Sequence, residues 1–393
     1  MNTSNYLVFL LKKHLNGESI VLDSEINFVK LAKLAEFHNL SAVLYCILNN
    51  AENKEIIDKS VLNGLENDFF KCLYNFELQK EVKNDISQVL SHAKVRHIFF
   101  KGTQTAKYYP VPESRKMGDI DFLIDFDNAQ SAKDALTENG YACKEYGGNV
   151  WTFAKNGVLA EMHLILIEKG EINESSYCFF KNAVNVGLYD GFSGTFDNEN
   201  EYHLAYLIAH IAHHFKFGGA GIRHILDIAS YVKNSNLNFE KVYRYLEETE
   251  LKTFSTVIFS ICDKWFGTNL IIGEKPNTEK CENYILKSGT FGTDSQKAVS
   301  LTRRSVTEYN KKIGLAIRLK LLFPSYEKMV SLPYMGFLKN KKYLLLFAWF
   351  YRAFYILFKR KNNAFKSIAN IGSKDTLKKA DEENNFFEEI GLQ

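Results

Sequence analysis

The pattern of residues 119–124, DIDFLI, limits the folds open to this chain more than any other stretch. Asp119, Asp121 and Leu123 alternate there with three large apolar residues, which is the period-two spacing of a β-strand with two different faces. One face is apolar, and the other carries two carboxylates. Because a strand needs partners for its backbone N–H and C=O groups, the pattern predicts a sheet with acidic groups on one face.

A strand and a helix are predicted on either side of this pattern. The apolar run of residues 95–100 stops at Lys101 and Gly102, which indicates a buried strand that ends in a turn. Downstream, Asp127 is the expected N-cap of a helix, and Gly140 stands where a C-terminal cap belongs. The chain therefore passes from strand to helix several times in this region.

A hairpin is predicted next, because Asn156-Gly157 is a strong signal for a two-residue turn between strands. The strand after this turn, residues 158–167, carries Glu161 and His163 on one face, since they are two positions apart. The middle of the chain thus reads as strand, helix, strand, helix and hairpin. This order predicts an α+β unit with a mixed sheet.

Helical spacing dominates the rest of the chain and suggests four regions. Residues 1–92 form a helical N-terminal region, 93–192 the α+β core, 193–372 a helical C-terminal domain, and 373–393 a polar tail that we expect to be frayed. The prolines number five in 393 residues, so long helices are free to run. A chain of this length also exceeds the usual size of a single domain.

One apolar run complicates this picture. Residues 343–358, YLLLFAWFYRAFYILF, are interrupted only by Arg352. A bilayer span needs about 20 apolar residues, and this run is shorter. A buried helix is the favoured interpretation and a helix on a membrane surface is the alternative. Stable membrane insertion is not expected.

The charge and cysteine content point to an ordinary cytoplasmic protein. The net charge of +3 does not by itself indicate a nucleic-acid partner, and the basic clusters at residues 311–320 and 339–342 are interpreted as solvated helix faces. The six cysteines are scattered without a C-x-x-C pair, which suits a reducing compartment. The N-terminal stretch does not have the pattern of a secretory signal.

The acidic residues suggest a metal site. The D-x-D spacing places Asp119 and Asp121 on one face of a strand, and Glu161 on a neighbouring strand would complete a set of hard oxygen ligands. Two magnesium ions held there, with manganese as a substitute, could clamp the oxygens of an in-line displacement at phosphorus. Gly102 allows close approach of a phosphate chain, and Thr103 offers a hydroxyl at a helix start.

Three motifs in this order resemble a known family: FFKGT at 99–103, RKMGDIDFLI at 115–124 and EMHLIL at 161–166. They resemble the bacterial uncharacterised nucleotidyltransferase family of the polymerase-beta-like superfamily and, more distantly, the nucleotidyltransferase toxins of abortive-infection systems. The resemblance spans residues 95–230, with a weaker similarity at 322–329. It implies a polymerase-beta-like core with a mixed sheet, flanked by N-terminal and C-terminal helical domains.

The resemblance also implies ligands and roles. Gly102 and Thr103 occupy the Gly-Ser motif of the superfamily, Asp119 and Asp121 its two metal-binding acids, and Glu161 the place of the third acid. Thr replaces the usual Ser and Glu the commoner Asp, which can alter the geometry of the metal site. The implied reaction uses an NTP, with ATP expected, and two magnesium ions to transfer an NMP and release pyrophosphate.

Two basic residues near the acids are expected to bind the nucleotide. Lys101 would neutralise triphosphate charge, with a solvated lysine at the strand end as the alternative. Arg115 would either reach a phosphate or pair with the acids. His163 would orient Glu161, contact the nucleotide, or be an ordinary core histidine.

A second cluster lies in the helical region after the core. His210 and His214 are one turn apart, but a zinc site is disfavoured because the motif lacks the Glu of H-E-x-x-H. By the resemblance, His210 and Arg223 would line the nucleotide pocket. A surface pair between Arg223 and Asp227, also one turn apart, is the alternative.

The acceptor of the nucleotidyl group remains open at this stage. A small molecule, a peptide or a tRNA would fit, because this superfamily modifies several classes of acceptor. A toxin-like enzyme acting on tRNA is one alternative reading. A nucleotide-binding module without turnover, docked on a membrane or a partner through the aromatic residues 343–358, is another.

Overall fold

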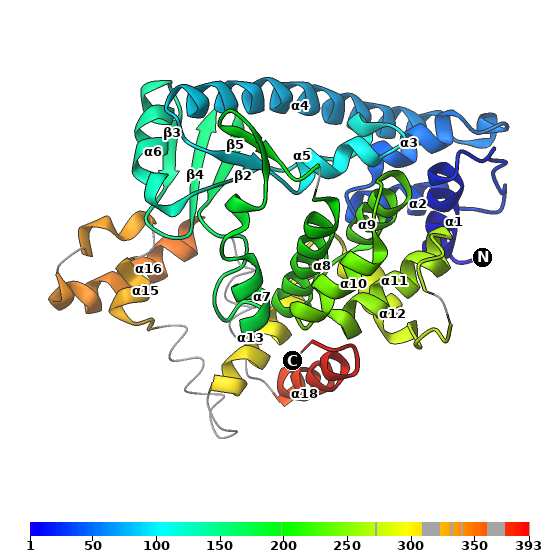
Figure 1. Ribbon diagram of the computed structural model, residues 1–393. Coiled ribbons are helices and arrows are strands. Elements are labelled where there is room, and N and C mark those ends of the chain that lie inside the picture. The colour runs from blue at the N-terminus through cyan, green and yellow to red at the C-terminus, as the bar shows by residue number, and fades with distance from the viewer. Residues whose placement is uncertain are drawn as a thin grey trace.

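The computed structural model describes residues 1–197, 199–271, 273–308, 323–330, 333–338, 341–359 and 374–392. Its centre is a mixed sheet with the strand order β3-β4-β5-β2-β1-β7-β6 (Figure 1). The strands are β1 (His97–Phe99), β2 (Ile120–Ile124), β3 (Ala142–Glu145), β4 (Val150–Lys155), β5 (Val158–His163), β6 (Leu188–Asp190) and β7 (Ser193–Thr195). With the helices around it, the sheet gives the predicted α+β fold.

The helices fall into three groups along the chain. Before the sheet come α1 (Thr3–Leu15), α2 (Phe28–Phe37), α3 (Ser41–Asn49) and the long α4 (Lys59–His92). Among the strands lie α5 (Gly102–Thr105), α6 (Ala129–Glu138) and α7 (Glu174–Phe180). After the sheet come α8 (Asn200–Phe217), α9 (Ile222–Asn234), α10 (Phe239–Glu248), α11 (Lys252–Phe266), α12 (Glu279–Ser288), α13 (Asp294–Glu308), α15 (Tyr326–Val330), α16 (Leu345–Lys359) and α18 (Lys374–Glu389).

One face of the sheet is covered by α4 and α6. The apolar residues of β2, Ile120, Phe122 and Ile124, belong to the same buried cluster as Val82 and Ile86 of α4. In Figure 1, α4 runs along the sheet and continues to the N-terminal helices, so one helix links the two regions. The period-two pattern of residues 119–124 thus has the apolar face that the sequence predicts.

The opposite face of the sheet packs against α8. Leu123, Ile98 and Phe100 belong to the large core that includes the N-terminal helices and α8 to α12. The ring centroid of Phe100 lies 5.4 Å from that of Tyr206 in α8. Because alternate residues of a strand share a face, Asp121 lies on the same face as Leu123. The acids are therefore on the side of the sheet that α8 covers.

The turn between β4 and β5 is the predicted hairpin. Asn156 has φ of +53° and Gly157 has φ of +80°, so both central residues have positive φ, as a type I′ turn requires. The strands pair in register from Lys155 with Val158 onwards. β5 ends at His163, earlier than the predicted end of the strand at residue 167.

The helix α6 differs slightly from its prediction at the start and matches it at the end. Asp127 is not the N-cap, because it lies in a short 3-10 turn and Asn128 precedes the helix. At the other end, Gly140 has φ of +85°, and the N–H of Tyr141 donates to the carbonyl oxygen of Leu136 at 3.0 Å. This is a glycine-terminated helix end, in which a left-handed residue lets the last carbonyls find donors.

Two short strands were not predicted. β6 and β7 form a small hairpin, and β7 pairs with β1 in parallel, at His97 with Ser193. The sheet therefore extends to Thr195, past the predicted end of the α+β core at residue 192. Strands of three residues are too short for a period to be read from sequence.

The C-terminal tail is helical rather than frayed, so that prediction is wrong. α18 packs against α13, and Phe387 and Ile390 are buried. The Nε of Arg303 in α13 lies 3.1 Å from Oε2 of Glu383, and both side chains are buried. Apart from Glu383, the acidic residues of α18 are exposed to solvent, and its apolar residues hold the helix in place.

The apolar run near the C-terminus forms α16, but it is not the buried helix that was favoured. Phe347 and Phe350 are 61% and 69% exposed, whereas Ala348 is fully buried. Within the described part of the chain, no helix combines the length and apolarity that a membrane span needs. Residues 311–320 and 339, which hold most of the predicted basic faces, and residue 322 of the weaker motif lie outside the described residues.

Candidate active site

The register of the sheet brings two of the predicted acids together. β2 and β5 are parallel neighbours, and Asp121 stands directly opposite Glu161 in their register. The side chain of Asp121 is almost fully buried, whereas that of Glu161 is 31% exposed. The two carboxylates therefore sit at the border between the core and solvent.

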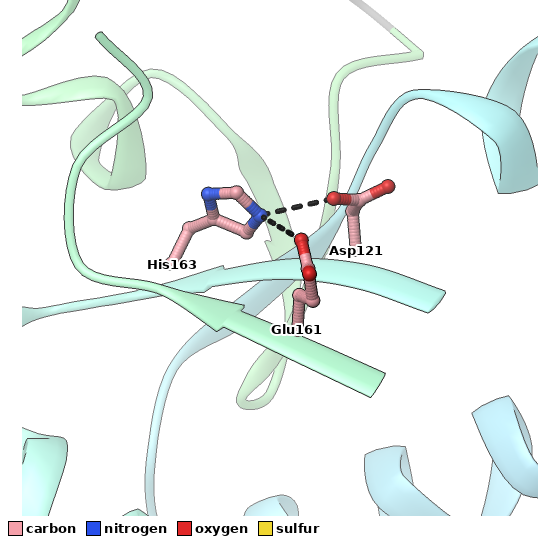
Figure 2. A group of neighbouring side chains, drawn as sticks. All are labelled: Asp121, Glu161 and His163. Atoms are coloured by element: carbon pink, nitrogen blue, oxygen red, sulfur yellow. Dashed lines mark hydrogen bonds and ion pairs between the residues drawn. The ribbon is translucent and has the colours of Figure 1, made fainter. Parts of the chain in front are cut away.

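His163 joins these acids from the end of β5. Its Nε2 lies 2.9 Å from Oδ1 of Asp121 and 3.6 Å from Oε2 of Glu161, and Figure 2 shows the ring pointing at both carboxylates. Within the described residues, these three form the one group of His, Cys, Asp and Glu whose ligand atoms are all close enough to share a metal ion, within 4.8 Å of one another. The sequence placed His163 on the face of Glu161 but left its role open.

The third predicted acid, Asp119, stands just before β2, outside this group of ligand atoms, and adds to the negative charge. Burial raises the pKa of its carboxyl to about 6, and repulsion from Asp121 and Glu161 adds to the shift. A carboxyl whose pKa is raised in this way sits where negative charge is not fully compensated. This environment fits a divalent cation, which would supply the missing positive charge.

His163 and Lys101 hold the other two acids in their ionised form. The hydrogen bond from His163 lowers the pKa of Glu161. Burial alone would raise the pKa of Asp121, but Lys101 and His163 together bring it below the usual value. The three acids are therefore not equivalent, since Asp119 alone keeps a raised pKa.

Lys101 is held against the acids by its backbone. Its φ is +54°, a conformation that is strained for a residue with a side chain. Its Nζ lies 2.6 Å from Oδ1 of Asp121, and this attraction outweighs burial and raises the pKa of the ammonium group. The side chain also lines the cavity described below. It is thus a partly buried cation at the acids rather than a solvated lysine.

The turn that follows Lys101 leaves little space. A Cβ added to Gly102 would lie 2.9 Å from Nη1 of Arg115, so only glycine fits without displacing the guanidinium group. The hydroxyl of Thr103 donates to the carbonyl oxygen of Phe100 at 3.0 Å. That hydroxyl therefore stabilises the turn in this structure.

Arg115 pairs with Asp227 and not with the site acids, although pairing with those acids was one of the two predictions for it. Its Nε and Nη2 donate to the two carboxylate oxygens of Asp227 in α9 at 2.8 and 2.9 Å. The hydroxyl of Tyr109 donates to the same carboxylate at 2.6 Å. All three side chains are buried. The pair ties the loop before β2 to the helices that follow the sheet.

Arg223 does not form the surface pair with Asp227 that was the alternative. It is buried, its Nη1 donates to the carbonyl oxygen of Lys116 at 3.2 Å, and its Nε is without a hydrogen-bond partner among the described residues. Burial and the nearby Arg115 lower the pKa of its guanidinium group. Because Asp227 is already shared with Arg115, Arg223 retains positive charge that an anion would stabilise.

His210 lies in a cavity beside the acids. The cavity has a volume of about 480 Å³, and its lining includes Lys101, His163, Tyr206, His210, His213 and Phe217. Tyr206, His213 and Phe217 were not predicted, although they stand within two turns of His210 on α8. Aromatic walls with a few polar groups are typical of sites for small ligands.

The histidines of α8 form a neutral pair. The Nε2 atoms of His210 and His214 lie 3.1 Å apart, and burial, together with nearby positive groups, lowers both pKa values well below the usual range. A zinc ion at His210 and His214 would need a third protein ligand, and within the described residues no third ligand atom lies close enough to both. Of the pair, His210 lines the cavity and presents an uncharged imidazole there.

Acids on neighbouring parallel strands, beside a cavity walled by helices, are an arrangement that suits metal-assisted phosphate chemistry. The chain belongs to the family described as uncharacterised nucleotidyltransferase, whose family model matches residues 24–267. The matched part extends from the N-terminal helices to the end of α11 and contains every site residue named above. The resemblance to this family is thereby confirmed, and the protein is a nucleotidyltransferase. Neither the curated proteins nor the solved structures contain a significant match.

The raised pKa of Asp119 leads to a prediction about stability. An acid with a raised folded-state pKa binds its proton more tightly when folded, so its ionisation opposes folding above that pKa. We expect Asp119→Asn to increase the unfolding free energy of the metal-free protein by about 1–2 kcal/mol at pH 7, after allowance for solvent screening. The gain should shrink as the pH falls from about 6 to about 4, because the wild-type carboxyl is then protonated.

Urea unfolding in the presence of a chelator, repeated across that pH range, measures this effect. Asp127→Asn is the control, because Asp127 is exposed and outside the site. Equal stability of Asp119→Asn and wild type at pH 7 would show that Asp119 is not electrostatically destabilised.

Proposed function

We propose that this nucleotidyltransferase moves a nucleoside monophosphate, AMP in the first instance, from an NTP to an acceptor hydroxyl or phosphate and releases pyrophosphate. The proposal rests on one observation above all. Asp121 and Glu161 stand side by side on parallel strands, and His163, within hydrogen-bonding reach of Asp121, lines a cavity large enough for a small ligand. Nothing in the packing of the sheet requires two acids and a histidine at that place.

Asp119, Asp121 and Glu161 would hold the divalent cations, magnesium in the first instance. The donor set supports this assignment, because magnesium prefers carboxylate oxygens and Asp119 has uncompensated negative charge around it. When bound, the cations would neutralise the charge that develops on the phosphate oxygens. His163 would orient the carboxylates of Asp121 and Glu161 through its Nε2.

Two basic groups would bind the triphosphate: Lys101 in the cavity lining and Arg223 beside the loop before β2. Lys101 is close enough to the acids to move from Asp121 to a phosphate when cations occupy the carboxylates. The Nε of Arg223 is without a hydrogen-bond partner among the described residues, and Arg223 shares the nearby charge of Asp227 with Arg115. Gly102 would allow the backbone of α5 to approach the phosphates. Arg115 would act indirectly, because it holds the turn at Gly102 in place.

Glu161 is the best candidate for accepting the proton of an acceptor hydroxyl. It is the most exposed member of the group in Figure 2, and its pKa is lowered, so it is ionised at neutral pH. The uncharged imidazole of His210 and the aromatic rings of α8 would hold the nucleoside or the acceptor by stacking and hydrogen bonds. The identity of the acceptor follows from the experiment below.

The test compares ATP labelled at the α-phosphate with ATP labelled at the γ-phosphate. The full chain is incubated with each nucleotide, magnesium and an extract that contains proteins, RNA and small metabolites. We expect the α-label to enter an acceptor, the γ-label to appear in pyrophosphate, and a chelator to abolish both. Transfer of the γ-label to an acceptor would contradict the proposal, because it would make the reaction a phosphoryl transfer.

A further inference from the structure

The helix α16 belongs to a small unit with a core of its own. Met329, Met335, Leu338 and Ala348 form a buried cluster separate from the two large cores of the molecule. The indole N–H of Trp349 donates to the carbonyl oxygen of Pro324 at 2.9 Å, which fixes the helix on this unit. In Figure 1 the unit, drawn in orange, lies at the edge of the molecule below the sheet. It also lies outside the part that matches the family model.

The outward face of α16 is apolar, which reverses the usual arrangement of a surface helix. The exposed side chains recur at intervals of three and four residues, as one face of a helix requires: Tyr343, Leu346, Phe347, Phe350 and Tyr351. The rings of Phe347 and Tyr351 also contact Phe337, which is itself partly exposed. A contiguous exposed patch of this kind marks an interaction site.

The sequence that contains this patch is strongly basic. From residue 328 to residue 374 the sequence contains ten Lys or Arg and no Asp or Glu, although the whole chain has 49 basic and 46 acidic residues. Lys341 and Lys342 stand at the start of the helix and are exposed. The partner of the patch should therefore be apolar at its centre and negatively charged around it.

We propose that α16 docks the protein on the surface of an anionic lipid bilayer. A bilayer offers both features, since its acyl region accepts the aromatic side chains and its anionic headgroups attract the basic residues nearby. Tyr and Phe at the level of the headgroups are typical of such contacts. The helix then lies in the plane of the bilayer surface, because its 15 residues are too few to cross the bilayer.

RNA is the less suitable anionic partner. RNA-binding surfaces combine basic grooves with separate aromatic residues on which bases stack. The outward face of α16 is instead a continuous stripe of Leu, Phe and Tyr, and Lys341 and Lys342 stand at its end. A second copy of the chain would bring two basic patches together, which costs electrostatic energy.

The test measures cosedimentation of the full chain with vesicles. We expect binding to mixed vesicles of phosphatidylcholine and phosphatidylglycerol, and weaker binding to pure phosphatidylcholine. Phe347→Ser/Phe350→Ser should weaken binding to the mixed vesicles by at least about tenfold. Phe70→Ser/Phe126→Ser, which removes two exposed phenylalanines elsewhere, should bind like wild type.

The basic residues are tested in the same assay. Lys341→Gln/Lys342→Gln should weaken binding by about tenfold, and Lys30→Gln/Lys33→Gln on α2 should not. Raising the salt from about 0.1 M to about 1 M should also weaken it. Thermal melting checks that each variant is folded.

Three results would overturn the proposal. The first is an equal amount of wild type and Phe347→Ser/Phe350→Ser in the vesicle pellet. The second is binding to tRNA that displaces the protein from vesicles and is unaffected by the phenylalanine variant. The third is a dimer in solution, without vesicles, that the phenylalanine variant converts to monomer.

Discussion

Asp121→Asn is expected to reduce nucleotidyl transfer by about 1000-fold, the equivalent of about 4 kcal/mol of transition-state stabilisation. Asp121 faces Glu161, Lys101 and His163 at once, so no other carboxylate of the site has as many polar contacts. The amide keeps the size of the side chain but loses the charge that a cation and Lys101 both require. The initial rate of α-label transfer from ATP measures the loss.

A measurement of metal binding distinguishes a specific loss of activity from misfolding of the variant. Titration of the metal-free protein with Mn²⁺ should show weaker binding for Asp121→Asn, while its circular dichroism spectrum stays that of wild type. Asp125→Asn is the matched control, because Asp125 follows β2 directly and pairs with Arg96 away from the site. Full activity of Asp121→Asn would show that Asp121 is not needed in the metal site, and it would contradict the proposed mechanism.

Local patterns in the sequence are sufficient to predict the acidic strand and its hairpin. The alternation in residues 119–124 is a property of six neighbouring residues, and the positive φ values at Asn156 and Gly157 follow from residue type. The pairing of Asp121 with Glu161 is different. It depends on which strands become parallel neighbours, and the motif order indicated this only through the resemblance to a family.

Contacts between distant segments account for what the sequence did not predict. Asp227 stands 112 residues after Arg115, and no local pattern marks either residue as the partner of the other. The walls of the cavity come from α8, whose spacing predicts a helix but not the side that faces the acids. α16 was predicted to be buried because its residues are apolar, yet composition does not tell which apolar helix remains uncovered.

The buried pair of Arg115 and Asp227 should be the most sensitive structural contact near the site. Two hydrogen bonds join the guanidinium and carboxylate groups at 2.8 and 2.9 Å, and Tyr109 satisfies the carboxylate further. Replacing one partner of such a pair leaves an uncompensated charge in the core. We therefore expect Asp227→Asn to lower the unfolding free energy by about 3–5 kcal/mol, since it leaves both Arg115 and the neighbouring Arg223 without a counter-ion.

A double-mutant cycle tests this assignment. The double variant Arg115→Met/Asp227→Leu removes both charges. Its unfolding free energy should fall by less than that of Asp227→Asn, because a buried ion pair can often be replaced by an apolar pair with little loss of stability. Urea unfolding measures both, with Arg244→Met as the control for a solvent-exposed ion pair, that of Arg244 with Glu248. A loss in the double variant equal to the sum of the losses of Arg115→Met and Asp227→Leu would mean that the two side chains act independently.

Activity of the same double variant would separate the two roles of Arg115. Its guanidinium group fills the space beside Gly102, where a Cβ would lie 2.9 Å from Nη1, so its loss frees the turn that follows Lys101. If Arg115 positions that turn, the refolded double variant should bind ATP with a raised KM even where its stability is restored. If Arg115 only packs in the core, the KM for ATP should equal that of wild type wherever the stability is restored. The pair thus links the packing of α9 to the shape of the turn that follows Lys101, and stability and KM measured together show whether Arg115 acts on the core alone or also on this turn.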